Sequence, residues 1–215
     1  MSLKRQGSAT IAQLAEELEL TGEAVRQQLL QLQREGWIEP KITRSPERSR
    51  TGRPATAYVL TTAGDHLFPK QYDALNVSMI DAVAEEFGED AARRVLKNVA
   101  EAKIAATEPT LRGLSLPERI KKLKDWYLTD DPYMEVEEVG DGYRLIERNC
   151  PYINTAMRRP SVCSVSVNAL SRLLGVRVVR DETFQAGHGR CAFHIYREEP
   201  VEATAEFQLE AEITR

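Results

Sequence analysis

Asn149-Cys150-Pro151 opens the stretch around which the fold is organised, and Gly187-His188-Gly189-Arg190-Cys191 closes it. Cys163 lies between them, so this stretch contains all three cysteines of the 215 residues. An odd number of cysteines argues against a closed set of disulfides, and a chain of this length can bury a core without them. We therefore expect reduced thiols that serve metal binding, redox chemistry or packing.

Each cysteine stands at a junction between predicted elements. Cys150 follows a predicted strand, residues 143–148, and precedes a proline that lacks a backbone N–H. Cys163 opens a predicted helix, residues 164–174, where unpaired N–H groups and the helix dipole favour a thiolate. Cys191 follows two glycines, which let backbone N–H groups approach a sulfur, and it heads another strand. Because no CxxC pair is present, the spacing alone leaves simple packing of small buried side chains open.

The sequence around the cysteines resembles a known family. The matching runs are Tyr143-Arg-Leu-Ile-Glu-Arg-Asn-Cys-Pro-Tyr152, Pro160-Ser-Val-Cys163, Leu173-Leu-Gly-Val-Arg-Val-Val-Arg180 and Gly187-His-Gly-Arg-Cys-Ala-Phe-His-Ile195. They are similar to the sensor domain of SufR-type iron–sulfur transcriptional repressors, and the likeness extends over nearly the whole chain. The resemblance implies a cytoplasmic regulator with an N-terminal winged helix-turn-helix of the ArsR/DeoR-like kind. It also implies that Cys150, Cys163 and Cys191 hold a [4Fe-4S] cluster, and that the cluster-bearing protein binds an operator near iron–sulfur assembly genes.

Three cysteines leave one iron of a four-iron cluster for another ligand. His188 and His194 lie three residues either side of Cys191. His188, in the glycine turn, is a possible fourth ligand, whereas His194 sits at an odd offset along the strand and should point away from Cys191. With a histidine the site could also bind zinc, although these spacings are unlike compact zinc modules. The alternatives to a cluster are zinc, a thiol redox switch, a small-molecule pocket or no cofactor.

The first forty residues have the pattern of two helices joined by a tight turn. Thr10 and Gln13 form a predicted capping box at the first helix, Thr21 caps the second, and Gly36 ends it before a strand. This is the layout of a helix-turn-helix, with a plain antiparallel helix pair as the alternative. The side chains that we expect to reach bases and phosphates in a major groove are Thr21, Glu23, Arg26, Gln27 and Gln31.

A basic segment follows this pair of helices. Residues 41–54 carry five basic side chains and one acid, whereas the whole chain has a net charge of -4. The segment interrupts a predicted hairpin, residues 38–43 and 56–60, so we expect a wing in which Arg48, Arg50 and Arg53 contact phosphates or the minor groove. Because only about seven residues precede the first predicted helix, we expect either that the first helix of this domain is truncated or that another segment covers the apolar faces of the other two.

The remaining sequence predicts an α+β protein with a long helical region before a sensor domain. Apolar residues recur at helical spacing from Ser78 to Ala105, with a break at Gly88. This amphipathic region should pair two copies of the chain, unless it is a core helix within one copy. The sensor should be a mainly antiparallel sheet with helices to one side. The predicted regions are a winged helix-turn-helix (1–72), a helical linker and dimerisation region (73–110), the sensor domain (111–197) and a weakly ordered acidic tail (198–215).

These patterns predict a homodimeric DNA-binding transcriptional regulator, and the resemblance implies that it acts as a repressor on a double-stranded operator. The sequence contains neither a Ser/His/Asp arrangement nor a Gly-rich phosphate loop, so we expect no enzymatic activity. Without an apolar stretch of membrane-spanning length or a signal peptide, we expect a cytoplasmic protein with no membrane partner. The alternatives are a winged-helix regulator of another signal and a redox or electron-transfer module with no role on DNA.

Overall fold

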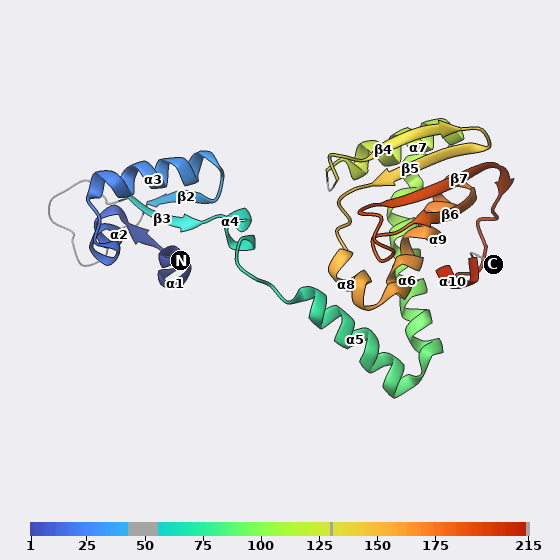
Figure 1. Ribbon diagram of the computed structural model, residues 1–215, viewed down its shortest axis with the longest axis horizontal. Helices are drawn as coiled ribbons and strands as arrows, with labels where there is room; N and C mark the ends of the chain where they lie inside the picture. Colours follow the sequence, from blue (N-terminus) through green and yellow to red (C-terminus); the bar gives the residue numbers. More distant parts are fainter. Residues whose placement is uncertain (43–55, 130, 214–215) are drawn as a thin grey trace. The chain divides into compact units, whose positions relative to one another are not determined.

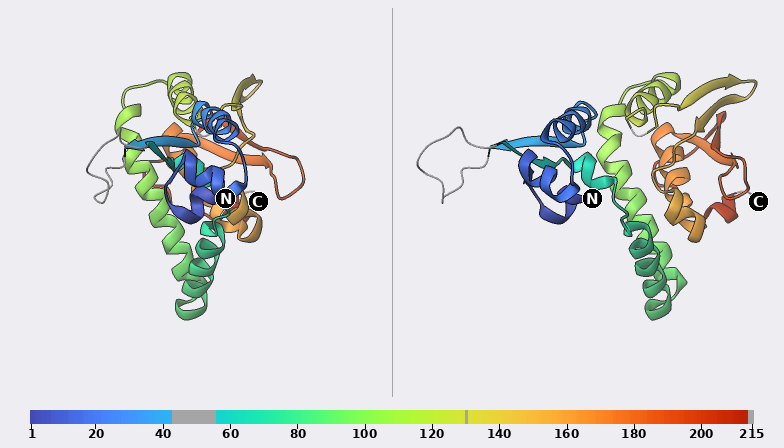
Figure 2. Two further views of the ribbon diagram at one scale, coloured as in Figure 1. Left: turned by 90° about the vertical axis from the view of Figure 1, so that its left-hand side faces the viewer. Right: turned by 60° about the vertical axis from the view of Figure 1, so that its left-hand side comes forward.

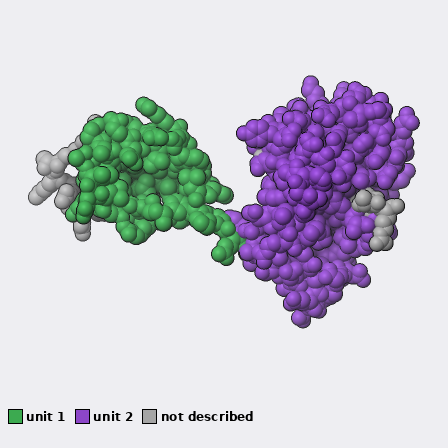
Figure 3. Space-filling view, in the orientation of Figure 1, with its two compact units in different colours: residues 1–71 green, residues 72–215 purple. Residues whose placement is uncertain are grey.

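The computed structural model describes residues 1–42, 56–129 and 131–213. The chain divides into two compact units, residues 1–71 and 72–215 (Figure 3). Each unit combines helices with an antiparallel sheet, which confirms the predicted mixture of helices and antiparallel strands. No helix in the described part of the chain is both long enough and apolar enough to cross a membrane.

The first unit is built on a small antiparallel sheet in the order β1-β3-β2 (Figure 1). The pairing of Ile38 with Leu60 and of Ile42 with Thr56 confirms the predicted hairpin, and the residues between its strands lie outside the described ranges. Its elements are α1 (Ser2–Gln6), β1 (Ala9–Thr10), α2 (Ile11–Leu18), α3 (Gly22–Arg34), β2 (Ile38–Ile42), β3 (Thr56–Leu60) and α4 (Thr62–His66).

Side-chain caps fix the start of both central helices of this unit. Gln13 Oε1 accepts the Thr10 N–H at 2.8 Å, and Thr10 Oγ1 accepts the Gln13 N–H at 3.3 Å, which confirms the predicted capping box of α2. Thr21 Oγ1 accepts the Ala24 N–H at 3.2 Å and caps α3. Between the helices, Glu19 adopts a φ of 54°, so the chain turns sharply within a few residues.

The core of the first unit lies where the apolar faces of α2 and α3 meet the sheet. Leu3 of α1 is buried in the same cluster, so this short helix covers part of those faces. Burial of such side chains is the main term that holds a small unit together. The buried members of the cluster are Leu3, Ala9, Leu14, Val25, Leu29 and Ile38.

The second unit is built on a four-stranded antiparallel sheet in the order β4-β5-β7-β6. The predicted strands before Cys150 and after Cys191, and the predicted helix at Cys163, are all present. The elements are α5 (Tyr72–Phe87), α6 (Glu89–Thr107), η1 (Glu108–Leu111), α7 (Leu116–Tyr127), β4 (Glu135–Val139), β5 (Gly142–Glu147), α8 (Ile153–Arg158), η2 (Pro160–Val162), α9 (Cys163–Leu174), β6 (Val176–Glu182), β7 (Cys191–Pro200) and α10 (Glu210–Ile213).

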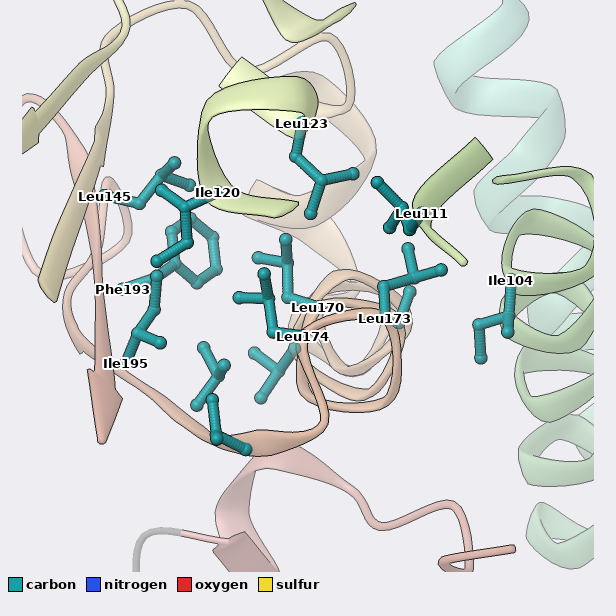
Figure 4. Packing of buried hydrophobic residues seen from close by; sticks show 14 of the residues in the cluster. Ile104, Leu111, Ile120, Leu123, Leu145, Leu170, Leu173, Leu174, Phe193 and Ile195 are labelled. Atoms are coloured by element: carbon teal, nitrogen blue, oxygen red, sulfur yellow. The ribbon is translucent and has the colours of Figure 1, made fainter. Parts of the chain in front are cut away.

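Helix α9 lies between the sheet and α6, and its apolar side chains pack in both directions (Figure 4). Leu170 and Leu174 of α9, Phe193 and Ile195 of β7, and Ile120 of α7 belong to one buried cluster. Because nine of its twelve residues are buried, α9 is the central element of this unit. Its first residue is Cys163, so the position of that thiol is fixed by the core.

Helices α5 and α6 form a hairpin that breaks at Gly88, as the sequence predicted (Figure 2). Gly88 has a φ of 86°, a conformation that glycine adopts far more readily than residues with a Cβ. Ala92, Leu96 and Ala100 of α6 are buried, and α6 packs against α9. The helical region therefore belongs to the same compact unit as the cysteines.

The prediction of a weakly ordered tail after residue 197 is wrong for residues 198–213. Strand β7 continues to Pro200, and Phe207 is buried in a cluster with Leu96 and Val165. The Asn168 side chain donates to the Gln208 carbonyl at 2.8 Å and accepts the Gln208 N–H at 3.0 Å. One buried aromatic ring and a paired backbone anchor this acidic segment to α9.

Candidate functional site

The Cys150 thiol lies in a corner that a buried carboxylate holds in place. Asp131, whose side chain is almost fully buried, accepts the N–H of Arg148 at 2.6 Å and that of Asn149 at 2.9 Å. Its other oxygen accepts the Tyr133 N–H at 3.0 Å. The chain between β5 and Cys150 is thus fixed by charge-assisted hydrogen bonds to one carboxylate.

The Cys163 thiol is buried at the start of α9 and faces the loop between β6 and β7. Gln185 of that loop donates from Nε2 to Cys163 Sγ at 3.4 Å and to the Ala156 carbonyl at 3.2 Å. The Gln185 Oε1 atom is buried and has no hydrogen-bond partner. A buried polar atom without a partner is costly, so this amide marks a place where a ligand could bind.

The Cys191 thiol begins β7 and is only 2% exposed. Arg180 of β6 donates from Nη1 to Cys191 Sγ at 3.5 Å. The rest of this guanidinium binds both oxygens of Glu210, each at 2.6 Å. Arg180 is itself 9% exposed, so a fixed cation lies directly beside the sulfur.

The three thiols lie close enough to influence one another's charge. Burial raises the pKa of Cys150 to about 12, and Glu147, Cys191 and Cys163 add to that rise. Burial also acts to lower the pKa of Arg180, but its hydrogen bond to Glu210 and the nearby Cys163 and Cys191 raise it overall. The end of β5, the start of α9 and the start of β7 therefore bring together three cysteines that are distant in sequence.

Every one of these sulfurs receives N–H donors. The Tyr152 backbone N–H binds Cys150, Gln185 binds Cys163, and the Phe184 backbone N–H binds Cys191 together with Arg180. Burial raises the pKa of Cys191, whereas these Phe184 and Arg180 contacts lower it. The donors at Cys191 therefore come from the Phe184 backbone and the Arg180 side chain. Gly187 and Gly189 adopt φ values of 85° and 67° within the exposed loop.

Glu147 lies at the thiols, and Lys103 lies near Glu147. The Cys150 thiol shares a hydrogen bond with the Glu147 carboxylate, and Glu147 pairs directly across the sheet with Cys191. Burial raises the pKa of Glu147, Asp131 raises it further, and Cys150, Lys103 and Arg180 lower it. Lys103 of α6 lies over the rings of Tyr127 and Tyr152 at 5.1 and 5.9 Å. Glu147 and Lys103 both line a cavity of about 130 Å³.

Within residues 1–42, 56–129 and 131–213, no three His, Cys, Asp or Glu side chains converge closely enough to hold one ion. The ligands of an iron–sulfur cubane bind different irons and stand farther apart than the ligands of one zinc ion. Hydrogen bonds to the sulfurs, as found here, are a regular feature of such sites.

The two histidines that flank Cys191 have other contacts. His188 is exposed, and its Nδ1 accepts the Thr183 N–H at 3.1 Å, which leaves Nε2 as the nitrogen that could bind a metal. His194 Nε2 binds Asp141 at 2.8 Å and its ring lies 4.3 Å from that of Tyr196. His194 thus faces away from the thiols, as the strand alternation predicted.

The predicted DNA contacts on α3 are exposed. Glu23, Arg26, Gln27 and Gln31 are exposed, whereas Val25 and Leu29 of the same helix are buried. Glu23 pairs with Arg26 at 3.5 Å and accepts a hydrogen bond from Gln27 at 2.8 Å. Thr21 serves as the helix cap. The wing residues Arg48, Arg50 and Arg53 lie outside the described residues.

Several residues of the site were missed by the sequence reasoning. Glu147 could have been predicted from the sequence, because it continues the alternation of Tyr143 and Leu145. This alternation places an acid on the apolar face of a strand. Asp131, Arg180 and Gln185 carried none, since their roles depend on distant segments that meet in the fold. Comparison of the chain with protein families, curated proteins and solved structures gave no match.

Proposed function

We propose that the chain is a DNA-binding transcriptional repressor whose C-terminal unit holds a [4Fe-4S] cluster through Cys150, Cys163 and Cys191. The observation that carries this proposal is the meeting of the buried Cys163 and Cys191 thiols with the half-buried Cys150 thiol, each with an N–H donor. A bound cluster would supply an oxidant-sensitive link between the three elements that bear these cysteines. The cluster state then couples to operator binding.

The Cys150 thiol is poorly suited to a simple redox switch. A reactive cysteine needs thiolate character near neutral pH, and burial raises the pKa of Cys150 to about 12. A bound cation reverses this effect, because a metal ligates the deprotonated sulfur. This argument favours metal ligation over thiol–disulfide chemistry at Cys150.

The second unit offers a physical route from the cysteines to the helical hairpin. Cys163 begins α9, α9 packs along α6, and α6 packs along α5, whose first residue follows the first unit. A constraint on the Cys163 thiol therefore limits movement of the helices that lead to residue 71. Loss of the cluster would remove its tie between the start of α9 and the other two cysteine-bearing elements. A resulting shift of α9 against α6 is the two-state change that the proposal requires.

DNA binding is supported by the arrangement of the first unit. Two helices joined by a sharp turn precede a hairpin whose connecting segment is rich in arginine. This is the order of elements in a winged helix-turn-helix, with α3 as the recognition helix. Its exposed face carries arginine and glutamine side chains, which are suited to base edges and phosphates.

Homodimerisation is supported by an apolar groove in the second unit. The groove has a volume of about 500 Å³ and includes Met79 of α5 and Val95 and Val99 of α6. These three side chains are 55%, 41% and 51% exposed. Apolar surface of this kind is stabilised by burial against another apolar face. A second copy of the helical hairpin provides such a face, and a dimer presents two recognition helices to one operator.

Anaerobic purification tests the cluster directly. We expect the wild-type protein to contain iron and acid-labile sulfide in equal amounts and to absorb visible light. Cys150→Ser, Cys163→Ser and Cys191→Ser should each lower the iron content sharply. Zinc without sulfide would support a zinc regulator instead, and the absence of both iron and sulfide would refute the proposal.

A mobility-shift titration over several salt concentrations tests the DNA-binding part. Replacing Arg50 and Arg53 with alanine should lower the slope of log affinity against log salt by roughly two, because each phosphate contact contributes about one. The charge-matched control is Lys121→Ala with Lys122→Ala, two exposed positions on α7. An unchanged slope in the arginine variant would refute the wing assignment.

A further inference from the structure

The cysteine site contains a half-buried acid, Glu147, for which neither packing nor DNA binding provides a role. Glu147 ends β5 on the same face as Leu145, which belongs to the buried core. A carboxylate is costly in such a place unless it has a partner or a ligand. Its position beside the thiols therefore calls for an explanation at the site itself.

The sheet register places this acid against the thiols. Glu147 of β5 and Cys191 of β7 are directly paired, and paired residues in an antiparallel sheet project from the same face with adjacent Cβ atoms. Cys150 follows three residues later and shares a hydrogen bond with the Glu147 carboxylate. Glu147 is thus in contact with one of the proposed ligands and directly across the sheet from another.

Of the other candidate donors, Asp131 and His194 are already engaged. The Asp131 carboxylate accepts three backbone N–H groups and braces the corner before Cys150. His194 binds Asp141. His188 is bound through Nδ1 to its own loop, and its Nε2 could still bind a metal, but the residue is exposed in the glycine turn. Glu147 instead borders a cavity of about 130 Å³, which leaves its side chain room to reorient.

We propose that the Glu147 carboxylate is the fourth ligand of the site and binds, through oxygen, the iron that has no cysteine. This inference rests on the proposed cluster. The thiol proton that Cys150 shares with Glu147 is released to solvent when the sulfur binds iron, so both groups become ligands together. Lys103 and Arg180 offset the negative charge of three thiolates and one carboxylate.

Oxygen ligation makes one iron of the cluster different from the other three. Thiolate is a soft ligand that suits iron–sulfur clusters, whereas carboxylate is a harder ligand. The iron held by Glu147 is therefore the one most readily lost. The inference thus assigns the lability of the site to a particular side chain and a particular iron.

Anaerobic reconstitution of Glu147→Gln tests this assignment, with Glu137→Gln as the matched control on the neighbouring strand, where the side chain is exposed. We expect Glu147→Gln to lose one iron of four to a chelator roughly tenfold faster than wild type. Glu137→Gln should match wild type. Glu147→Cys, which restores a fourth thiolate, should retain all four irons longer than Glu147→Gln.

A measurement on the unaltered chain covers the case in which Glu147→Gln fails to fold. Electron–nuclear double resonance of the reduced wild-type cluster, with isotopically labelled glutamate carboxylates, should show coupling to one carboxylate carbon. Absence of that coupling, or equal iron loss in Glu147→Gln and Glu137→Gln, would overturn the ligand assignment while the proposed cluster stands. If wild type binds no cluster, the proposed function fails and the assignment fails with it.

Discussion

At the scale of single residues, Asp131 shows how one side chain can position a site that it does not enter. Its carboxylate accepts hydrogen bonds from the backbone N–H of residue 133, before β4, and from those of residues 148 and 149, after β5. Few side chains can accept three such bonds at once. The corner that carries Cys150 therefore depends on an acid that lies elsewhere in the sequence.

We expect Asp131→Ala to lower the free energy of unfolding by about 3 kcal/mol, because three backbone N–H groups lose their acceptor in a buried place. Urea denaturation followed by circular dichroism measures the change. Asp125→Ala, at an exposed position on α7, is the control and should change the stability by less than about 0.5 kcal/mol. Equal stability of the two variants would contradict the role of Asp131.

The ion pairs of Glu182 predict how the stability of the fold depends on pH. Hydrogen bonds from Arg190 and then Arg144 lower its pKa from 4.5 to about 2. A carboxyl group whose pKa is lower in the folded than in the unfolded chain stabilises the fold at pH values above the unfolded pKa. This stabilisation is lost as the pH falls from 4.5 towards 2. An NMR titration should therefore find the Glu182 carboxyl still ionised at about pH 3.

The arginine partners provide the control for this titration. Arg190→Ala should raise the Glu182 pKa towards 4.5, since the largest stabilising contact is removed. Arg172→Ala, whose partner Glu101 lies elsewhere in the unit, should leave the Glu182 pKa unchanged. A Glu182 midpoint near 4.5 in the wild-type protein would contradict the contacts described here.

At the scale of elements, the segment after β7 is an integral part of the second unit. Phe207 fills a cluster between α6 and α9, and Glu210 binds the guanidinium that faces Cys191. The C-terminal segment thus connects the apolar core to the cysteine site through Arg180. The acidic composition of the segment predicted weak order, because it contains few large apolar residues. The single ring of Phe207 nevertheless holds it against the core.

We expect Phe207→Ala to lower the free energy of unfolding by about 3 kcal/mol, through lost apolar burial and the cavity left behind. The midpoint of urea denaturation measures this loss. Tyr133→Ala is the control, because that ring is 67% exposed and its truncation should have little effect. A denaturation midpoint for Phe207→Ala equal to that of wild type would show that the segment is not packed.

At the scale of the whole molecule, the proposed dimer depends on the apolar face of the helical hairpin. We expect Val99→Glu to convert the dimer to a monomer, because it buries a charge in the contact. Sedimentation analysis measures the mass in solution. Asn98→Glu adds the same charge at an exposed position on α6 that does not line the groove, and it should remain a dimer.

The sequence predicted most elements because their signals are local. The capping box of Thr10 and Gln13, the break at Gly88 and the helix that begins at Cys163 each depend on a few neighbouring residues. The alternation of the strands also predicted that His194 faces away from the thiols. The error at the C-terminal segment arose because its order depends on contact with α9, which composition alone does not reveal.

The sequence by itself determined which segments are helices and strands, and it singled out three cysteines as a candidate site. Periodicity, caps and glycine breaks are properties of neighbouring residues, so they can be read along the chain. The tertiary structure alone decided which side chains surround the thiols. Glu147, Asp131, Arg180 and Gln185 reach the site through strand register, loop closure and packing on α9. These contacts join residues far apart in sequence, and their chemistry appears only when the fold brings them together.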